Sequence, residues 1–270
     1  MERFLMADGC AVRIADSGTK GCGEGAPVIL LLHGYFESIE VWERLTPYLT
    51  PHYRVIAMDI PGHGVTQVMG EVHTMEFVAD TAKAVLDTLE ISKCTIIGHS
   101  MGGYVTLAFV KKYPQMLSAA VMLHSTPNPD SDEKKIFRER EIEIVQSGKK
   151  DMLAKTTPFK GFAMANRKRC MDAIEELEDQ IYLTDEDGVL ALLRGMAARE
   201  DMNEMLKEST VPYVFVYGKD DEYIPVSVAE AVIERHSKAK VIWMENSGHM
   251  SLIEETELLA ERLIETFKAI

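Results

Sequence analysis

The chain has 270 residues, 46% of them hydrophobic, so it can bury a large core, and a disordered or collagen-like protein is excluded. Its 29 Lys and Arg residues against 43 Asp and Glu residues give a net charge of -14. That charge repels nucleic acids and anionic membrane surfaces on average, so we expect neither as a partner.

The cysteines and the first residues indicate a cytoplasmic protein. Four cysteines occur without Cys-X-X-Cys spacing and without the density of a disulfide scaffold, and we expect them to be reduced: Cys10, Cys22, Cys94 and Cys170. Charged residues interrupt residues 1–10, so a secretory signal is not expected. The chain also contains no run of about 18 apolar residues that could cross a bilayer.

The first elements along the chain are two short strands. Residues 4–6 and 11–15 flank Asp8-Gly9, a dipeptide typical of hairpin turns, and predict an antiparallel start. Short apolar runs rich in β-branched residues follow and predict strands at residues 28–32, 54–58, 95–97, 119–123, 213–217 and 241–244. Because these runs are continuous rather than alternating, we expect a parallel sheet covered on both faces.

Helical periodicity lies between most of these strands, at residues 74–91, 101–113 and 252–267. The alternation predicts an α/β fold with a mostly parallel sheet and an antiparallel edge. Residues 126–210 hold no comparable strand but several helical stretches, 133–146, 166–181 and 188–199, between turn-rich boundaries. We therefore expect a core domain of residues 1–125 and 211–270 with an inserted helical cap. The charge run 134–143 is typical of a solvated helix face.

The segment Gly98-His99-Ser100-Met101-Gly102 stands between a predicted strand and a predicted helix. A Gly-X-Ser-X-Gly sequence at such a turn is typical of an exposed nucleophile on a strained bend. A Cβ at either flanking glycine would clash with the neighbouring elements, and Gly103 gives the helix further room. The amide of Met101, at the helix N-terminus, can serve as an oxyanion donor. The alternative is an ordinary tight turn.

A serine nucleophile needs a base, and the base needs an orienting carboxylate. His249 follows the predicted strand at residues 241–244, at the sheet edge that carries Ser100. His236 follows a helix in a polar segment, and we expect it to be solvated. Asp220 and Asp221 follow the strand at 213–217, and only one of them can accept the histidine N–H. The order Ser, Asp, His fits a known hydrolase arrangement.

The second oxyanion donor is expected in the loop after the strand at residues 28–32. There His33-Gly34 lets the backbone turn its amides toward the nucleophile, and Tyr35 is the predicted donor. We expect His33 to be a structural residue that hydrogen bonds to loop backbone. Among the other histidines, His124 ends a strand without a glycine-rich exposure and is not expected at the site.

With these motifs the chain resembles the α/β-hydrolase superfamily, of the kind with a helical cap, over nearly its whole length. The resemblance rests on five motifs in order, namely His33-Gly34, residues 59–64 (DIPGHG), residues 98–103 (GHSMGG), residues 218–225 (GKDDEYIP) and Gly248-His249. In that family the acid commonly stands four residues before a proline. This implies Asp221, with Asp220 as the runner-up.

The resemblance implies a serine hydrolase, carboxylesterase-like, that cleaves an ester, thioester or lactone of a small, largely apolar substrate through an acyl-enzyme. Haloalkane dehalogenases and epoxide hydrolases of this fold carry aspartate at the elbow, where this chain has Ser100. Carbon–carbon bond hydrolases often have asparagine before the serine, and related lyases have arginine shortly after it. Here those places hold His99 and Gly103-Tyr104. These enzymes remain the alternative, and a non-enzymatic ligand receptor is the alternative of another class.

Tyr35, Tyr104 and Phe162 are the predicted substrate contacts, and most other methionines and phenylalanines of the cap are expected to pack its helices together. No phosphate-cradling loop or metal-ligand spacing appears, so neither a metal nor an organic cofactor is expected. The expected partner is a small ester-like molecule, and the protein is expected to be a monomer or a homodimer. A broad-specificity esterase without one defined substrate fits the same residues.

Overall fold

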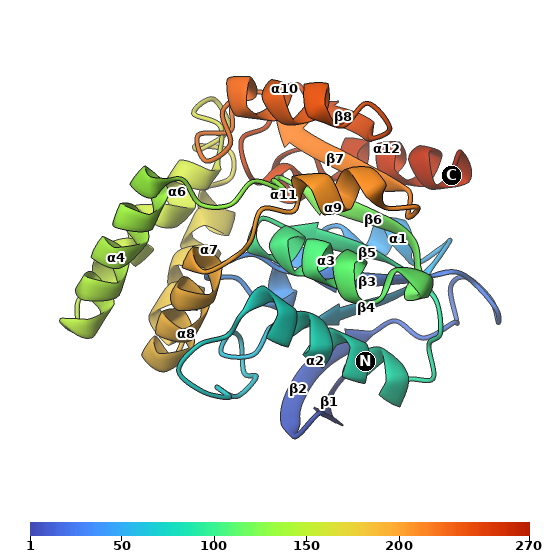
Figure 1. Ribbon diagram of the computed structural model, residues 1–270, viewed down its shortest axis with the longest axis horizontal. Coiled ribbons are helices and arrows are strands. Elements are labelled where there is room, and N and C mark those ends of the chain that lie inside the picture. Colours follow the sequence, from blue (N-terminus) through green and yellow to red (C-terminus); the bar gives the residue numbers. More distant parts are fainter.

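A computed structural model describes residues 1–270 and shows one eight-stranded sheet (Figure 1). The strands are β1 (Glu2–Ala7), β2 (Cys10–Asp16), β3 (Val28–Leu32), β4 (Arg54–Met58), β5 (Cys94–His99), β6 (Leu117–Leu123), β7 (Tyr213–Gly218) and β8 (Lys240–Met244). Their order in the sheet is β1-β2-β4-β3-β5-β6-β7-β8.

The predicted mixed sheet is confirmed. β1 and β2 form an antiparallel hairpin across Asp8-Gly9, β2 pairs antiparallel with β4, and the remaining strands are parallel. β3 and β5 lie at the centre, and neighbouring strands pair as Leu32 with Gly98 and Gly98 with Met122. The loops that follow these parallel strands therefore meet at one edge of the sheet.

Helices cover both faces of the sheet and form the inserted segment. They are α1 (Thr46–Leu49), α2 (Met75–Thr88), α3 (Met101–Lys112), α4 (Asp132–Gln146), α5 (Asp151–Ala154), α6 (Thr157–Gly161), α7 (Met171–Leu183), α8 (Glu186–Ala197), α9 (Asn203–Glu208), α10 (Val226–Arg235), α11 (Ser251–Glu254) and α12 (Thr256–Lys268), with 3-10 turns η1 (Ile39–Trp42) and η2 (Pro114–Met116). No helix combines the length and the apolar character needed to cross a bilayer.

The central strand β3 shows why the strand sequences are continuously apolar. Leu30 and Leu32 point into a core shared with α2, α3 and α10, whereas Ile29 and Leu31 point into a second core shared with α12. All four side chains are fully buried. Since a strand covered on both faces has no solvated side, it loses the polar alternation of a half-exposed strand.

The segment between β6 and β7 holds α4 to α9, and Figure 1 shows α4, α6, α7 and α8 beside one end of the sheet. The charged face of α4 is mostly exposed, as expected. The short helix α9 lies against α3 of the core instead, and its Leu206 is fully buried.

Two predicted helix boundaries are wrong. The helix expected from residue 166 begins at Met171, because the side chain of Asn166 is held by the Asn246 carbonyl and by Glu254 outside the helix. The final helix is broken between α11 and α12 at Glu255, whose backbone leaves the helical region and whose carboxylate accepts a hydrogen bond from Ser247.

Candidate active site

Ser100 occupies the bend between β5 and α3 with φ 50° and ψ -112°, a strained conformation for a residue that is not glycine. The flanking glycines permit this bend. A Cβ at Gly98 would lie 2.2 Å from the Gly102 carbonyl oxygen, and a Cβ at Gly102 would lie 2.1 Å from the Leu32 carbonyl oxygen. The side chain of Ser100 is thereby held at the surface of the core, partly exposed.

Asp221 and His249 form a buried pair. The Nδ1–H of His249 donates to Oδ2 of Asp221 at 2.8 Å. The other carboxylate oxygen accepts the backbone amides of Tyr223 and Ile224 at 2.8 and 2.9 Å, which fixes the carboxylate in the loop after β7. Asp220 is exposed and does not contact the imidazole. Of the two aspartates that the sequence offers, the structure thus places Asp221 against the histidine.

The electrostatics favour an ionised carboxylate at position 221. Burial by itself raises its pKa, but the neighbouring His249 and His124, which attract and hydrogen bond to the ionised form, lower the pKa well below the usual range. A permanently ionised acid suits a role in orienting the imidazole and in stabilising its protonated form.

The elbow and the loop that carries His249 are in direct contact. The Nε2–H of His99, the residue before Ser100, donates to the carbonyl oxygen of His249 at 2.9 Å. The centroids of the His99 and His249 rings lie 5.1 Å apart. The Ser100 hydroxyl itself makes no hydrogen bond within the protein, so it is free to bond to a ligand or to an imidazole brought within reach. Such bonds commonly form or shorten only with substrate bound.

The loop after β3 contains several amides without a hydrogen-bond partner, and that of Tyr35 is one of them. The amides of Gly34, Phe36 and Glu37 donate to the Glu37 carboxylate, to the His63 ring and to the Gly34 carbonyl, respectively. The Tyr35 amide has no such partner. The Met101 amide, at the first turn of α3, is likewise absent from the turn, loop and cap hydrogen bonds. The two amides predicted as oxyanion donors are thus available to a ligand.

Two histidines lock the loops after β3 and β4 together. Nε2 of His33 accepts the Ile60 amide, and Nε2 of His63 accepts the Phe36 amide, both at 2.9 Å. His33 therefore hydrogen bonds to loop backbone, as expected. Burial lowers the pKa of His63 to about 3, so the ring stays neutral and keeps its acceptor nitrogen. This arrangement explains the histidine of the DIPGHG segment, whereas Gly62 and Gly64 adopt positive φ angles of 85° and 57° that favour glycine.

His124 was not expected at the site, yet its Nδ1 lies 3.3 Å from Oδ2 of Asp221. Its Nε2 accepts the Ser251 hydroxyl at 2.7 Å, and burial lowers the pKa of the ring to about 4. The signal in the sequence was its place directly after β6, at the same sheet edge as Ser100. The donor atoms of His124, Asp221 and His249 lie within 4.8 Å of one another, as a metal site requires, but mutual hydrogen bonds already account for that spacing.

The expectation that His236 is solvated is wrong. Its ring is 2% exposed and lies between the Tyr213 hydroxyl and the Asn203 side chain, at 3.3 and 3.0 Å. The short helix α9 supplies Asn203, whose side chain contacts the ring at the end of α10, and the sequence pattern did not indicate this contact.

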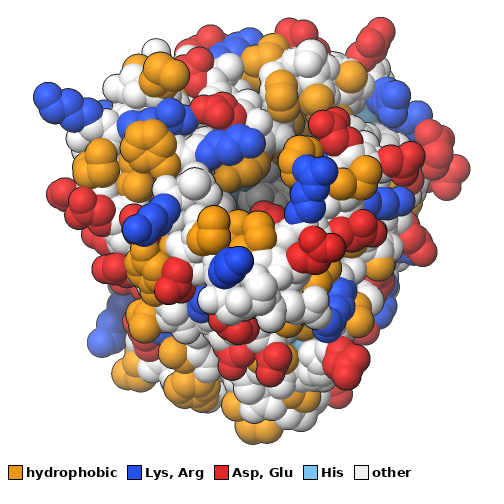
Figure 2. Space-filling view, turned by 90° about the vertical axis from the view of Figure 1, so that its left-hand side faces the viewer, with side chains coloured by type: hydrophobic (Ala, Val, Ile, Leu, Met, Phe, Trp, Pro, Cys, Tyr) orange, Lys and Arg blue, Asp and Glu red, His pale blue; other side chains and the backbone are white.

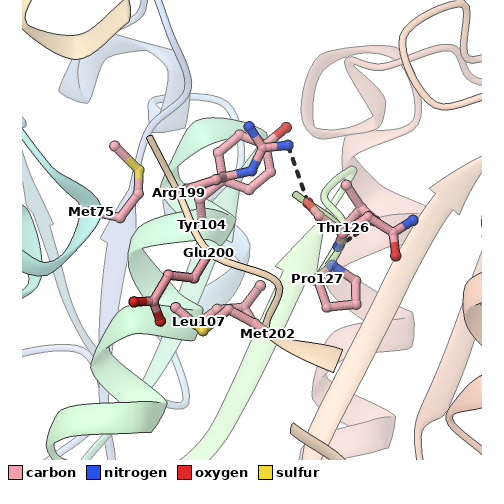
Figure 3. Close-up of a pocket in the computed structure, with 9 residues that line it drawn as sticks. Met75, Tyr104, Leu107, Thr126, Pro127, Arg199, Glu200 and Met202 are labelled. Carbon is pink, nitrogen blue, oxygen red and sulfur yellow. Dashed lines mark hydrogen bonds between the residues drawn. The ribbon is translucent and has the colours of Figure 1, made fainter. Parts of the chain in front are cut away.

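The tyrosines near the nucleophile lie among charged cap residues. The Tyr35 hydroxyl is buried without a partner. The Arg199 guanidinium lies 3.9 Å above the ring of Tyr104 (Figure 3). Although burial opposes it, the charge of Arg199 and of Arg138 and Lys134 lowers the pKa of the Tyr104 hydroxyl. The small cavity drawn in Figure 3 has a volume of about 10 Å³, which is room for a single water molecule.

The outer face of the cap is hollowed near its centre, and hydrophobic side chains together with lysine or arginine side chains border the hollow (Figure 2). The third predicted substrate contact, Phe162, is fully buried and belongs to the second core. Its side chain therefore has no exposed surface in the structure.

The chain is similar to known hydrolases in sequence and in structure. A family model of the alpha/beta hydrolase fold matches residues 27–162. The pimeloyl-(acyl-carrier protein) methyl ester esterase of Aeromonas hydrophila is 26% identical over 258 residues, which cover 91% of this chain and 96% of that protein. A thermophilic esterase from Thermogutta terrifontis superposes with a TM-score of 0.91 and 26% identity, covering 100% of this chain and 98% of that one.

A further relative is the dihydrolipoyllysine-residue acetyltransferase component of the acetoin cleaving system of Pseudomonas putida, 26% identical over 250 residues. These residues cover 90% of this chain, but the chain spans only 64% of that protein's length. The family model covers half of the chain and agrees with the sheet order and the elbow that the structure shows. The chain therefore belongs to the alpha/beta hydrolase fold family.

Proposed function

We propose that the protein is a cytoplasmic serine esterase that hydrolyses a carboxylic ester, thioester or lactone of a small, largely apolar molecule through an acyl-enzyme. The observation that carries this proposal is the buried Asp221–His249 pair in the loop that His99 joins to the strained elbow of Ser100. The esterases among its relatives support ester cleavage over other reactions of the fold.

In the proposed reaction, Ser100 Oγ attacks the acyl carbonyl carbon while His249 takes the hydroxyl proton. The carbonyl oxygen becomes an oxyanion held by the amides of Tyr35 and Met101, each donor commonly contributing about 3 kcal/mol. Collapse of this intermediate breaks the ester bond, and His249 returns the proton to the leaving alcohol. Water then attacks the acyl-enzyme by the same steps, giving the acid and free Ser100. No metal and no organic cofactor take part.

We assign the hollow of the cap face as the substrate entrance. We assign Tyr35 and Tyr104 as pocket walls because of their place in the chain. Both tyrosines stand beside the catalytic loops, Tyr35 after β3 and Tyr104 one turn after Ser100 on α3. Their rings supply apolar surface, and their hydroxyls leave a hydrogen-bonding group at one end of the pocket.

The test is labelling by a fluorophosphonate probe and turnover of short p-nitrophenyl esters. Wild type should react with the probe and turn over ester, and Ser100→Ala should do neither. Asp221→Asn should lower kcat by about 10⁴-fold, because the amide holds the imidazole in the wrong tautomer. Asp220→Asn is the matched control and should stay within about twofold of wild type, since Asp220 is exposed. A Ser100→Ala protein that labels as wild type does would overturn the proposal.

A further inference from the structure

His99 stands between Gly98 and the nucleophile, and its ring is fully buried. Both ring nitrogens face oxygen atoms. Nδ1 lies 2.9 Å from Oε2 of Glu37, and Nε2 lies 2.9 Å from the carbonyl oxygen of His249. Glu37 Oε2 also accepts the Gly34 amide at 2.6 Å.

These contacts restrict the protonation state of the ring. A carbonyl oxygen can only accept a hydrogen bond, and so can an ionised carboxylate, so each nitrogen of His99 must carry a proton to satisfy its partner. A neutral ring carries only one. The alternative is a neutral ring that accepts a proton from an un-ionised Glu37 carboxyl. That state is disfavoured because Oε2 is the oxygen that already accepts the Gly34 amide.

We propose that His99 is a buried imidazolium paired with the Glu37 carboxylate, and that the pair is a positioning device that holds the oxyanion loop, the nucleophile elbow and the loop of His249 in register. The positioning role rests on the proposed function, whereas the charge state of His99 does not.

The pair reaches all three loops through hydrogen bonds to rigid groups. Glu37 holds the Gly34 amide, next to the free amide of Tyr35. His99 is part of the elbow itself, and its Nε2–H fixes the backbone of His249. A hydrogen bond to a charged group is stronger than a neutral one, so loss of the charge loosens each link.

The charges around the ring favour the ion pair. Besides Glu37, the ionisable groups facing His99 are Asp221 and the rings of His124 and His249, at 6.0 and 5.1 Å between ring centroids. Burial by itself lowers the pKa of His99, but Glu37 and the acceptors around the ring raise it above its ordinary value. In the same way burial raises the pKa of Glu37, and His99 outweighs it and lowers the pKa.

The first experiment reads the charge directly. Long-range proton–nitrogen NMR of the labelled full chain distinguishes an imidazolium, with two protonated nitrogens, from either neutral tautomer, and loss of signals in His99→Gln assigns them. We expect His99 to be an imidazolium at pH 7 in wild type and a neutral ring in Glu37→Gln. A neutral His99 in wild type at pH 7 overturns the ion pair, whether or not the protein is an esterase.

The second experiment tests the positioning role by measuring ester turnover. Glu37→Gln keeps the shape of the side chain, and we expect kcat for p-nitrophenyl esters to fall at least tenfold with KM within about threefold. Glu43→Gln makes the same charge change on an exposed side chain nearby and should leave both constants unchanged. Wild-type kcat in Glu37→Gln overturns the positioning role.

Glu37→Asp separates the effect of the negative charge from the effect of side-chain length. It also tests the positioning role if Glu37→Gln does not fold. The shorter carboxylate keeps the negative charge but cannot hold the Gly34 amide and the His99 ring together. We expect a similar loss of kcat while His99 remains an imidazolium. Wild-type kcat in this variant contradicts the positioning role. If the wild-type chain neither labels with the fluorophosphonate probe nor turns over ester, the proposed function is wrong. The NMR result on the charge of His99 is independent of that outcome.

Discussion

At the scale of single residues, the carboxylate of Asp221 accepts four hydrogen bonds. Two come from the amides of Tyr223 and Ile224, one from His249 at 2.8 Å and one from His124 at 3.3 Å. His124 and His249 share one carboxylate oxygen, so we expect His124 to hold that oxygen in its direction toward the His249 imidazole. We therefore predict that His124 is a positioning residue that acts through Asp221.

Two substitutions separate the nitrogens of His124. In His124→Asn the amide nitrogen can take the place of Nδ1 and donate to Asp221, whereas in His124→Gln the longer side chain reaches the Ser251 hydroxyl instead. We expect His124→Gln to lower kcat by about tenfold, matching the loss of one hydrogen bond of about 1.4 kcal/mol to a charged group. His124→Asn should retain most of kcat, and KM should change little in both.

The measurement is steady-state turnover of p-nitrophenyl esters, with thermal unfolding to confirm that both variants fold. Equal kcat losses in the two variants would show that His124 supports the fold and not the carboxylate.

The residues predicted from the sequence are those whose role is local. Ser100 and its glycines follow from the bend between a strand and a helix, and His249 follows from its place at the same sheet edge. The choice of Asp221 over Asp220 depended on the resemblance, since adjacent loop residues look alike in a sequence. His124 could not be assigned, because its contact with Asp221 joins residues that are 97 positions apart.

At the scale of elements, the cap is tied to the loop of His249 by backbone contacts. The His249 amide donates to the Gly161 carbonyl at the end of α6, at 2.7 Å. Glu254 accepts the Ala163 amide of the cap at 2.9 Å and the Gly248 amide of the core at 2.8 Å. Placement of α6 and placement of the imidazole are therefore linked.

Two glycines in this contact give a matched test. A Cβ at Gly248 would lie 2.6 Å from the Ala163 amide nitrogen, so the backbone must shift, whereas a Cβ at Gly161 would meet only the flexible side chain of Met250, at 3.2 Å. We expect Gly248→Ala to destabilise the fold by about 1–3 kcal/mol and to lower kcat, as overpacking does. Gly161→Ala should cost less than about 1 kcal/mol. Urea unfolding and ester turnover measure both, and equal effects would contradict the link.

The strands are more predictable than the helices for a physical reason. A strand buried on both faces is a short apolar run, and all eight strands were predicted within two residues at each end. Helix ends depend on capping partners elsewhere in the fold. Asn166 is held by Asn246 and Glu254, which lie 80 and 88 positions away, so the start of α7 could not be read from local sequence.

At the scale of the whole molecule, buried neutral histidines make folding sensitive to acid. Burial lowers the pKa of His63 to about 3 and that of His124 to about 4, and it also lowers the pKa of His33, His73 and His236. In the unfolded chain these rings titrate near pH 6.5. Between that pH and the folded pKa values the unfolded state binds more protons than the native state. The free energy of unfolding must therefore fall as the pH drops through this window.

The size of this effect is up to about 1.4 kcal/mol per pH unit for each ring that is neutral in the native state and protonated in the unfolded state. We expect urea unfolding to show a steep loss of stability between pH 6.5 and pH 5. Carboxylates contribute little in that range, because their unfolded pKa values lie near 4. His99 acts in the opposite sense. Its raised pKa gives a stability that is complete below pH 6.5 and is lost only as the pH rises through the folded value.

His236→Gln isolates one ring, because His236 lies away from Ser100, between Tyr213 and Asn203. This variant should lower the slope of stability against pH by up to about 1.4 kcal/mol per unit and leave ester turnover intact. His52→Gln, which removes an exposed ring, is the matched control. A free energy of unfolding that stays flat from pH 6.5 to pH 5 would mean that the buried rings are already protonated in the native protein. In that case His63 and His124 could not accept the hydrogen bonds that join the loops of the site.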